Sequence, residues 1–346
     1  MHYFFLTFLE NLLYPYHLLR FMGDNLYIEL DAKDKKILNE LDYNARESHT
    51  QIAKNTGIAK HVVQYRINNL INKDFIKNFI SFIDIQQLGY TFYDVFLKLK
   101  HLSNEQDKKI IDELKSVPEV GWFISTRGEW KIVVCVMAKN ASHFNLVLKK
   151  ILGIVRDRLI RYEFFIVLTG SQLPYKKVLG AKNETMPTHL GRTEEYKLKK
   201  NDFEVLQELA VDARISVSDI ADKHYLSNAQ VRYSIKTLER SGVIQAYKPL
   251  IDVSKAGYRW HIILLQLNYC SENEKKQFIE YLKNLEQVFY IVKGVGNWSL
   301  MVEFHTKEID EFNQLQDTIN AKYEKLISTE SVMQVTKEHK CVFYPV

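Results

Sequence analysis

The chain has 346 residues, of which 46% are hydrophobic and 26% are charged, so it exceeds one typical hydrophobic core and favours about two to four domains. Its net charge of +5 at pH 7 is compatible with a nucleic-acid partner but does not select one. The cysteines Cys135, Cys270 and Cys341 form no CxxC pair, which argues against a disulfide framework and a Cys-based zinc site and fits a reducing cytoplasm.

Residues 1–29 are predicted to be an N-terminal extension. The first 22 are aromatic and apolar, but Glu10, Pro15 and Arg20 make them a poor membrane span. They also lack the charged start and the small-residue cleavage site of a signal peptide. We expect this segment to be poorly integrated into the fold, with translation starting at Met22, and we expect no membrane partner.

The next segment, 30–86, predicts a three-helix domain with a wing. Its helices are expected at 33–41, 50–55 and 60–70, with Gly57 in the tight turn before the third. The third helix has one apolar face, and no acidic residue occurs from 58 to 73. Its polar face carries residue types that read bases, although a lone helix of this kind is usually an ordinary surface helix. Residues 75–85 alternate enough to form a β-hairpin, the wing.

A second copy of the whole unit follows at an offset of 168 residues, without a gap over most of its length. It predicts helices at 201–210, 217–223 and 228–240, a C-cap at Gly242 and a wing at 243–253. Because each unit is as large as a domain, the repeat indicates a tandem duplication and not a solenoid. The matching residues include Ala45-Arg46 with Ala213-Arg214, Ser48 with Ser216, Tyr65 with Tyr233, Gly128 with Gly296 and Trp130 with Trp298.

After its helical domain, each unit reads strand–helix–strand–strand–helix–strand. This order predicts a ferredoxin-like sandwich, with two helices on one sheet face and the other face open. An open apolar face needs a partner, so we expect the two sheets to pack together within one chain as a pseudo-dimer. The fold class is α+β. The predicted elements are 90–100, 105–115, 120–126, 130–137, 142–151 and 159–168 in the first unit, and 258–267, 272–283, 288–293, 298–304, 309–323 and 328–336 in the second.

These elements divide the chain into predicted domains. The stretch between the units is rich in Gly, Pro, Lys, Glu and Thr and is expected to be a solvated tether, with contact to the DNA backbone as the alternative. The boundaries are an extension at 1–29, winged helices at 30–86 and 198–254, αβ sandwiches at 88–170 and 256–346, and a linker at 171–197.

The helical domains resemble the DNA-binding domain of the Lrp/AsnC (feast/famine) family of transcriptional regulators, and the αβ domains resemble its ligand-sensing RAM domain. The resemblance covers nearly all of 30–340, twice over. It rests on Leu30-Asp31-x-x-Asp34-x-x-Ile37-Leu38-x-x-Leu41, Ala45-Arg46-x-Ser48, Ile52-Ala53 and Val63-x-x-Arg66-Ile67-x-x-Leu70, and on Val231-x-x-x-Ile235-x-x-Leu238-x-x-x-Gly242-Val243-Ile244.

The family implies a sequence-specific regulator that reads double-stranded DNA through winged helix-turn-helix domains. Because the two predicted reading faces differ, we expect an asymmetric pair of half-sites about one helical turn or a multiple apart. The tyrosines Tyr65 and Tyr233, shared by both copies, are expected to pack against a neighbouring helix or domain. The predicted DNA-binding residues are Lys60, His61, Gln64, Arg66, Asn68 and Lys77 in the first unit, and Ser227, which would cap its helix, Asn228, Arg232, Lys236 and Lys248 in the second.

The family also implies an amino acid or a related small molecule as effector, bound near the loop that follows the second strand of each αβ domain. The family's loop reads Gly-x-aromatic-Asp, but Lys131 and Ser299 stand here in place of the Asp, so a carboxylate for an amino group is missing from both copies. Asp74 likewise stands where the family has the glycine kept as Gly242, and Ser234 replaces the arginine kept as Arg66. The predicted effector residues are Thr126, Gly128, Trp130, Gly296 and Trp298.

Two alternatives remain open at this point. Siroheme decarboxylases share the architecture, but the histidine of their His-Asn-Tyr-x-Arg-type segment is absent from both 122–127 and 290–293. A degenerate scaffold that does not bind DNA is the third reading, given the nearly neutral second helical domain. We expect no enzymatic activity, no cofactor and no metal site. Whether the chain forms further homo-oligomers beyond the intrachain pseudo-dimer is left open.

Overall fold

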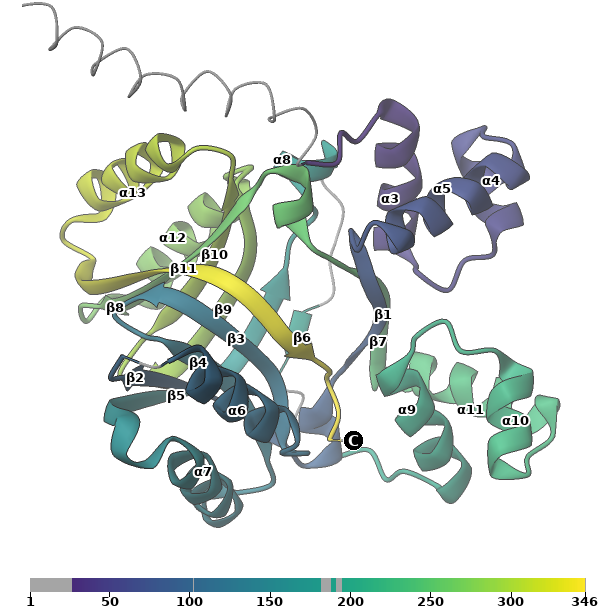
Figure 1. The fold of residues 1–346 in the computed structure, drawn as a ribbon, viewed down its shortest axis with the longest axis horizontal. Coiled ribbons are helices and arrows are strands. Elements are labelled where there is room, and N and C mark those ends of the chain that lie inside the picture. The colour runs from purple at the N-terminus through teal and green to yellow at the C-terminus, as the bar shows by residue number, and fades with distance from the viewer. Residues whose placement is uncertain (1–26, 102, 182–187, 191–194, 346) are drawn as a thin grey trace, which may run out of the picture.

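The computed structural model describes residues 27–346 except 102, 182–187, 191–194 and 346. The predicted extension at 1–29 therefore lies almost entirely outside the described residues. Figure 1 shows a strand barrel with helices on its outside, and two helical domains set apart on one side of it. A two-stranded ribbon runs between the barrel and the helical domains. No described helix is long and apolar enough to cross a membrane.

Three short helices form each helical domain, as predicted. Each domain buries the predicted apolar stripe, and serine or aspartate side chains cap several of the helices because their oxygens accept from the first free N–H groups. Gly57 adopts the left-handed conformation (φ 69°) that the turn before the third helix requires. The helices are α3 (Ala32–Tyr43), α4 (His49–Thr56) and α5 (Lys60–Asn72), then α9 (Lys200–Val211), α10 (Val217–His224) and α11 (Asn228–Ser241).

The two predicted wing hairpins are wrong. Each segment is one strand, β1 (Ile76–Ile83) in the first unit and β7 (Ile244–Ile251) in the second, and the two pair antiparallel with each other. Neither segment forms a hairpin. The backbone hydrogen bonds that the second strand of a hairpin would provide come instead from the strand of the other unit. Helix α3 packs on β7, and α9 packs on β1, so each helical domain rests on the strand of the opposite unit.

The αβ domains have the predicted strand and helix order. Within the first unit the strands lie in the order β5-β2-β4-β3, and within the second in the order β11-β8-β10-β9, which is the ferredoxin-like arrangement. The first unit contains β2 (Thr91–Leu99), α6 (Asn104–Lys115), β3 (Val120–Gly128), β4 (Ile132–Ala138), α7 (Ala141–Val155) and β5 (Leu159–Gln172). The second contains β8 (Arg259–Leu267), α12 (Glu272–Asn284), β9 (Val288–Gly296), β10 (Leu300–Thr306), α13 (Ile309–Tyr323) and β11 (Ile327–Cys341).

The two sheets associate within the chain, and they do so edge to edge. Strand β3 pairs with β11, and β5 pairs with β9, so the eight strands named above close into one barrel with the helices outside. Gly128 and Gly296 lie at the two seams, each with φ 133°. A Cβ on Gly128 would approach the Val332 carbonyl oxygen to 2.7 Å, and one on Gly296 would approach the Phe164 carbonyl oxygen to 3.0 Å. The repeated glycine therefore permits the close pairing that joins the units.

The predicted linker is partly folded. Strand β5 extends to Gln172 and is followed by the short helix α8 (Lys176–Leu179) and the strand β6 (Thr188–Leu190), which pairs with β5. Tyr175 and Val178 are buried, so this part of the chain joins the core instead of acting as a tether. The segments 182–187 and 191–194 of the predicted linker lie outside the described residues.

Candidate DNA interface and barrel-mouth cavity

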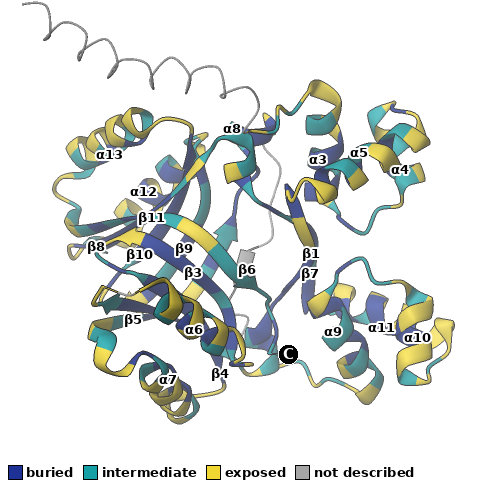
Figure 2. Ribbon diagram, viewed as in Figure 1, coloured by how far each residue is buried: buried dark blue, intermediate teal, exposed yellow. Residues whose placement is uncertain are grey.

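The first predicted reading face is exposed on α5. Val63, Ile67 and Leu70 are buried against the rest of the domain. The opposite face carries the predicted polar and basic side chains, and each of them is exposed. They are Lys60, His61, Gln64 and Asn68. Helix α5 lies between α3 and α4 in the helical domain that is set apart from the barrel, and exposed residues occur along it (Figure 2).

The second reading face is exposed on α11 and differs in chemistry. Ser227 caps the helix as predicted: its hydroxyl accepts from the Gln230 backbone N–H (3.2 Å), and the Gln230 side chain accepts from the Ser227 N–H (2.8 Å). Asn228, Arg232 and Lys236 are exposed. The two helices thus present different sets of donors and acceptors at equivalent positions.

Three of the predicted DNA-binding residues are engaged within the protein. The Arg66 guanidinium donates to Asp31 and Asp34, at 2.8 Å each, and so fixes α5 to the start of α3. Lys77 is exposed but forms an ion pair with Asp252 (3.0 Å). Lys248 is 1% exposed and forms an ion pair with Asp42 of the other unit (3.3 Å between Nζ and Oδ1), so it is unavailable to DNA.

The expectation that the repeated tyrosines pack inside is wrong. Tyr65 is 70% exposed and Tyr233 is 66% exposed. Tyr65 directly follows Gln64, and Tyr233 directly follows Arg232, so each tyrosine borders the reading face on the surface of its helix. Tyrosine hydroxyls donate to phosphate oxygens in protein–DNA complexes, so both belong with the candidate interface.

The repeated Ala-Arg pairs lock the two helical domains together reciprocally. Arg46 donates to the carbonyls of Ala213 and Ile215, while Arg214 donates to the carbonyls of Ala45 (2.8 Å) and Glu47 (3.4 Å). The arginines also stack on equivalent rings of the ribbon. Arg46 lies over Tyr247 at 5.4 Å from the ring centroid, and Arg214 lies over Phe79 at 5.0 Å. This contact holds α5 and α11 in one relative position.

Two turn positions carry glycine in one unit and a larger residue in the other. Tyr225 has φ 55° at the position equivalent to Gly57, and Asp74 has φ 55° at the position equivalent to Gly242. Side chains rarely adopt this left-handed conformation because Cβ crowds the backbone. Tyr225 is 97% exposed, so its side chain gains little packing in return.

The predicted effector residues serve the barrel. Trp130 is fully buried beside Phe96, and the Thr126 hydroxyl donates to the Trp130 carbonyl (2.6 Å). The Trp298 indole donates to Glu163 (3.1 Å) across a seam. With Gly128 and Gly296 at the seams, none of the five predicted residues lines the cavity described next.

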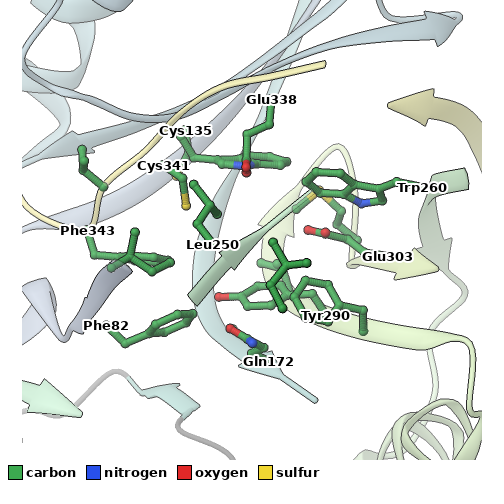
Figure 3. A pocket seen from close by; sticks show the side chains of 18 of the residues that line it. Phe82, Cys135, Gln172, Leu250, Trp260, Tyr290, Glu303, Glu338, Cys341 and Phe343 are labelled. Carbon is green, nitrogen blue, oxygen red and sulfur yellow. The ribbon is translucent and has the colours of Figure 1, made fainter. Parts of the chain in front are cut away.

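A cavity of about 120 Å³ lies at the mouth of the barrel, where the ribbon closes it (Figure 3). Its walls include equivalent residues of both units, namely Phe92 with Trp260, Trp122 with Tyr290 and Cys135 with Glu303. Phe82 and Leu250 of the ribbon form another wall. The lining is mostly aromatic and aliphatic, yet it includes the acids Asp94, Glu303 and Glu338 and the base His305.

Burial favours the uncharged forms of these polar groups. It raises the pKa of Glu303 to about 8, assisted by the nearby Glu338, and raises the pKa values of Asp94 and Glu338 to about 7. The Trp122 indole donates to Glu338 (2.9 Å). Burial also lowers the pKa of His305 to about 3, so its imidazole is neutral and supplies no positive charge. No described group of three or more His, Cys, Asp and Glu is arranged to hold a metal ion.

Sequence reasoning missed this cavity. The available signal was a single acid inside each of two otherwise mainly apolar strands, Asp94 in β2 and Glu303 in β10. A charged residue at the centre of such a strand is costly to bury unless it has a role. That signal does not show which strands meet, and Glu338 comes from a third strand of the barrel.

Comparison with known proteins agrees with the domain architecture. Residues 30–77 and 198–245 each match the family model described as winged helix-turn-helix DNA-binding. The HTH-type transcriptional regulator FL11 of Pyrococcus horikoshii is 30% identical over 118 residues, which are 34% of this chain and 77% of FL11. The regulatory protein AsnC of Haemophilus influenzae is 30% identical over 122 residues, which are 34% of this chain and 79% of AsnC.

One solved structure is similar over nearly the whole chain. The siroheme decarboxylase NirDL in complex with an iron-uroporphyrin III analogue matches 90% of this chain and 94% of its own at a TM-score of 0.58. Its sequence identity is 13%, so the likeness shows the fold alone. Each regulator relative, in contrast, corresponds to about one unit, and the DNA-binding match occurs twice. The chain therefore belongs to the Lrp/AsnC family of HTH-type transcriptional regulators, with two family units in tandem.

Proposed function

We propose that this chain is a sequence-specific DNA-binding regulator whose two unequal reading helices are held in one relative position. The observation that carries the proposal is the combination of two different exposed faces, on α5 and α11, with the reciprocal Arg46 and Arg214 contacts that join their domains. A homodimer presents the same face twice and suits a palindrome, whereas this pair suits two different half-sites. The chain thus performs as a monomer what the family performs as a dimer.

The test is selection of duplex DNA from a random pool by the full chain, followed by affinity measurements over a range of salt concentrations. We expect the selected sequences to contain two different half-sites. Palindromes built from either half should bind at least about 10-fold more weakly, which corresponds to about 1.4 kcal/mol. A palindrome that binds best would overturn the proposal of unequal readers. Binding that does not fall steeply with salt would instead favour the non-DNA-binding scaffold.

Variants assign each helix to its half-site. Gln64→Ala should cost about 1–3 kcal/mol of affinity and relax specificity in one half-site only, and Arg232→Ala should do the same in the other. Lys60→Ala, at the start of α5, should weaken binding to all sequences and reduce the salt slope by about 1. Lys109→Ala is the matched control, because Lys109 is exposed on α6 of the barrel, away from both reading helices.

The enzymatic alternative rests on the fold likeness to siroheme decarboxylase NirDL. A decarboxylase substrate carries carboxylates, but the described residues that line the barrel-mouth cavity include acids and no Lys or Arg. We therefore propose a non-enzymatic role. Adding siroheme to the protein tests this: a spectral shift followed by loss of carboxylate as CO₂ would favour the enzyme, and an unchanged spectrum supports the regulator.

The family resemblance also implies small-molecule sensing at the Gly-x-Trp loops. We propose sensing there only for a ligand that does not contact the two tryptophan rings. The Trp130 side chain is buried and Trp298 is 8% exposed, so an amino acid would not reach these rings, whereas Gly128 and Gly296 of the same loops are exposed. Titration of the twenty amino acids against a selected operator tests it. A change in affinity that a Gly296→Ala variant abolishes would support sensing there, and unchanged affinity throughout would refute it.

A further inference from the structure

The barrel-mouth cavity contains polar side chains whose hydrogen-bonding capacity is not met by the described residues. Glu303 is 4% exposed, and its carboxyl points into the cavity beside Trp260 (Figure 3). The indole of Trp260 is close enough to lower the pKa of Glu303 in part, but its Nε1 has no hydrogen-bond partner of acceptable geometry. No described residue donates a hydrogen bond of normal geometry to the Glu303 carboxylate. A buried carboxyl in this state costs stability, and a ligand could recover that loss.

The charge of the lining is one-sided. Asp94 and Glu338 lie in the same cavity, and no Lys or Arg occurs among its described lining residues. His305, the only basic group among the described lining residues, is held neutral by burial beside the rings of Phe289 and Tyr175. Besides burial, Glu338 and Asp94 raise the pKa of Glu303, so an incoming cation would be stabilised by more than one of these acids.

The remaining walls suit the apolar body of such a ligand. Trp122, Trp260 and Tyr290 supply aromatic faces that attract cations as well as apolar groups. The cavity volume of about 120 Å³ is slightly below the roughly 150 Å³ of an apolar cavity that admits benzene, so one aromatic ring is the upper size for the buried part of a ligand. The ribbon residues Phe82 and Leu250 would touch the ligand on the side that faces the helical domains.

We propose that the barrel-mouth cavity binds a small primary amine with an apolar body, its ammonium group held by Glu303 with Asp94 nearby and its body packed on Trp122 and Trp260. This site is separate from the Gly-x-Trp loops and does not depend on DNA binding. On binding, the Glu303 carboxyl releases its proton to solvent, and the ammonium replaces that proton as the partner of the carboxylate.

Benzylamine and benzyl alcohol test the proposal, because they have nearly the same shape and differ in charge. At pH 6, benzylamine should change the tryptophan fluorescence saturably and raise the melting temperature. Benzyl alcohol should bind at least 10-fold more weakly than benzylamine. Calorimetry in buffers of different ionisation enthalpy should detect close to one proton released per benzylamine bound. Equal binding of the two compounds, no binding of either, or no proton release would each overturn the proposal.

Two matched amide variants locate the ammonium group. Glu303→Gln should reduce benzylamine affinity at least 10-fold and abolish proton release while leaving benzyl alcohol unaffected. Glu105→Gln, an equivalent change at an exposed residue of α6, should behave as wild type. If Glu303→Gln does not fold, Asp94→Asn replaces it, with a smaller loss of benzylamine affinity expected. An affinity unchanged in the folded variant would refute the assignment.

Discussion

The ion pair between Lys248 and Asp42 allows a sharp test of how the two units are joined. Both side chains are buried, with side-chain exposures of 2% and 7%, and the pair links β7 of one unit to α3 of the other. At the equivalent place, 168 residues away, the chain has Ile80 and Ala210, which are 4% and 1% exposed. One half of the interface is therefore ionic and its counterpart is apolar, in otherwise equivalent surroundings.

Lys248→Ile removes the ion pair that Lys248 forms with the buried Asp42 carboxylate, so the free energy of unfolding should fall by about 3–5 kcal/mol. The pair of changes Lys248→Ile and Asp42→Ala copies the apolar half, and its free energy of unfolding should lie within about 1 kcal/mol of wild type or above it, because well-packed apolar groups replace buried ion pairs at little cost. Ile80→Val, which removes one methylene from the apolar half, serves as a packing control and should lose about 0.5–1.5 kcal/mol.

Urea unfolding, followed by circular dichroism at a fixed protein concentration, measures all four proteins. The m-value should stay constant so that the midpoints report stability. A paired variant that loses as much stability as Lys248→Ile alone would refute this reasoning. It would show that the effect comes from the lysine stem, or from the hydrogen bond that Lys248 donates to the Asp42 carbonyl oxygen, and not from the lost ion pair.

Three other predictions follow from the geometry. Arg46→Met and Arg214→Met should each lower the free energy of unfolding by about 2 kcal/mol or more in urea titrations, since each removes charged donors from two carbonyls, and equal stability to wild type would refute the lock. Tyr225→Gly should raise the melting temperature through a gain of about 0.5–1 kcal/mol, and Gly57→Ala should lower it by a similar amount. As pH rises from about 4.5 to 8, the contribution of Glu303 to stability should fall, because the folded state keeps the Glu303 proton that the unfolded state has lost. Glu303→Gln should remove this contribution, so that stability falls less, or rises more, with pH than in wild type; an unchanged pH dependence would contradict it.

Local signals in the sequence predicted the helices and the strand order well. Gly57, Ser227 and Gly242 act through residues within a few positions, so their conformations could be predicted without knowledge of the fold. The 168-residue repeat then supplied the two-unit architecture. The exposed faces of α5 and α11 followed from helical periodicity alone.

Pairing between distant segments is where the predictions failed. The wing strands were assigned to local hairpins because alternation shows that a strand exists but does not name its partner. Lys248 was assigned to DNA because a basic residue in a predicted wing is usually exposed, yet its partner Asp42 is 206 residues away. The cavity was missed for the same reason, since its acids come from three strands that only barrel closure brings together.

The exchange of strands between units has a consequence for how the chain reaches this fold. Strand β1 must wait for β7, and the outer edges of β5 and β3 must wait for β9 and β11, so the ribbon and the barrel cannot form until most of the second unit has been synthesised. During that interval β1 has no strand partner, and β3 and β5 are each paired on one side only; such open strand edges attract other chains. A first half released early would find the same edges on another copy of itself. Ribosome pausing between the halves is therefore expected to produce aggregates or dimers of the first unit in place of a folded monomer.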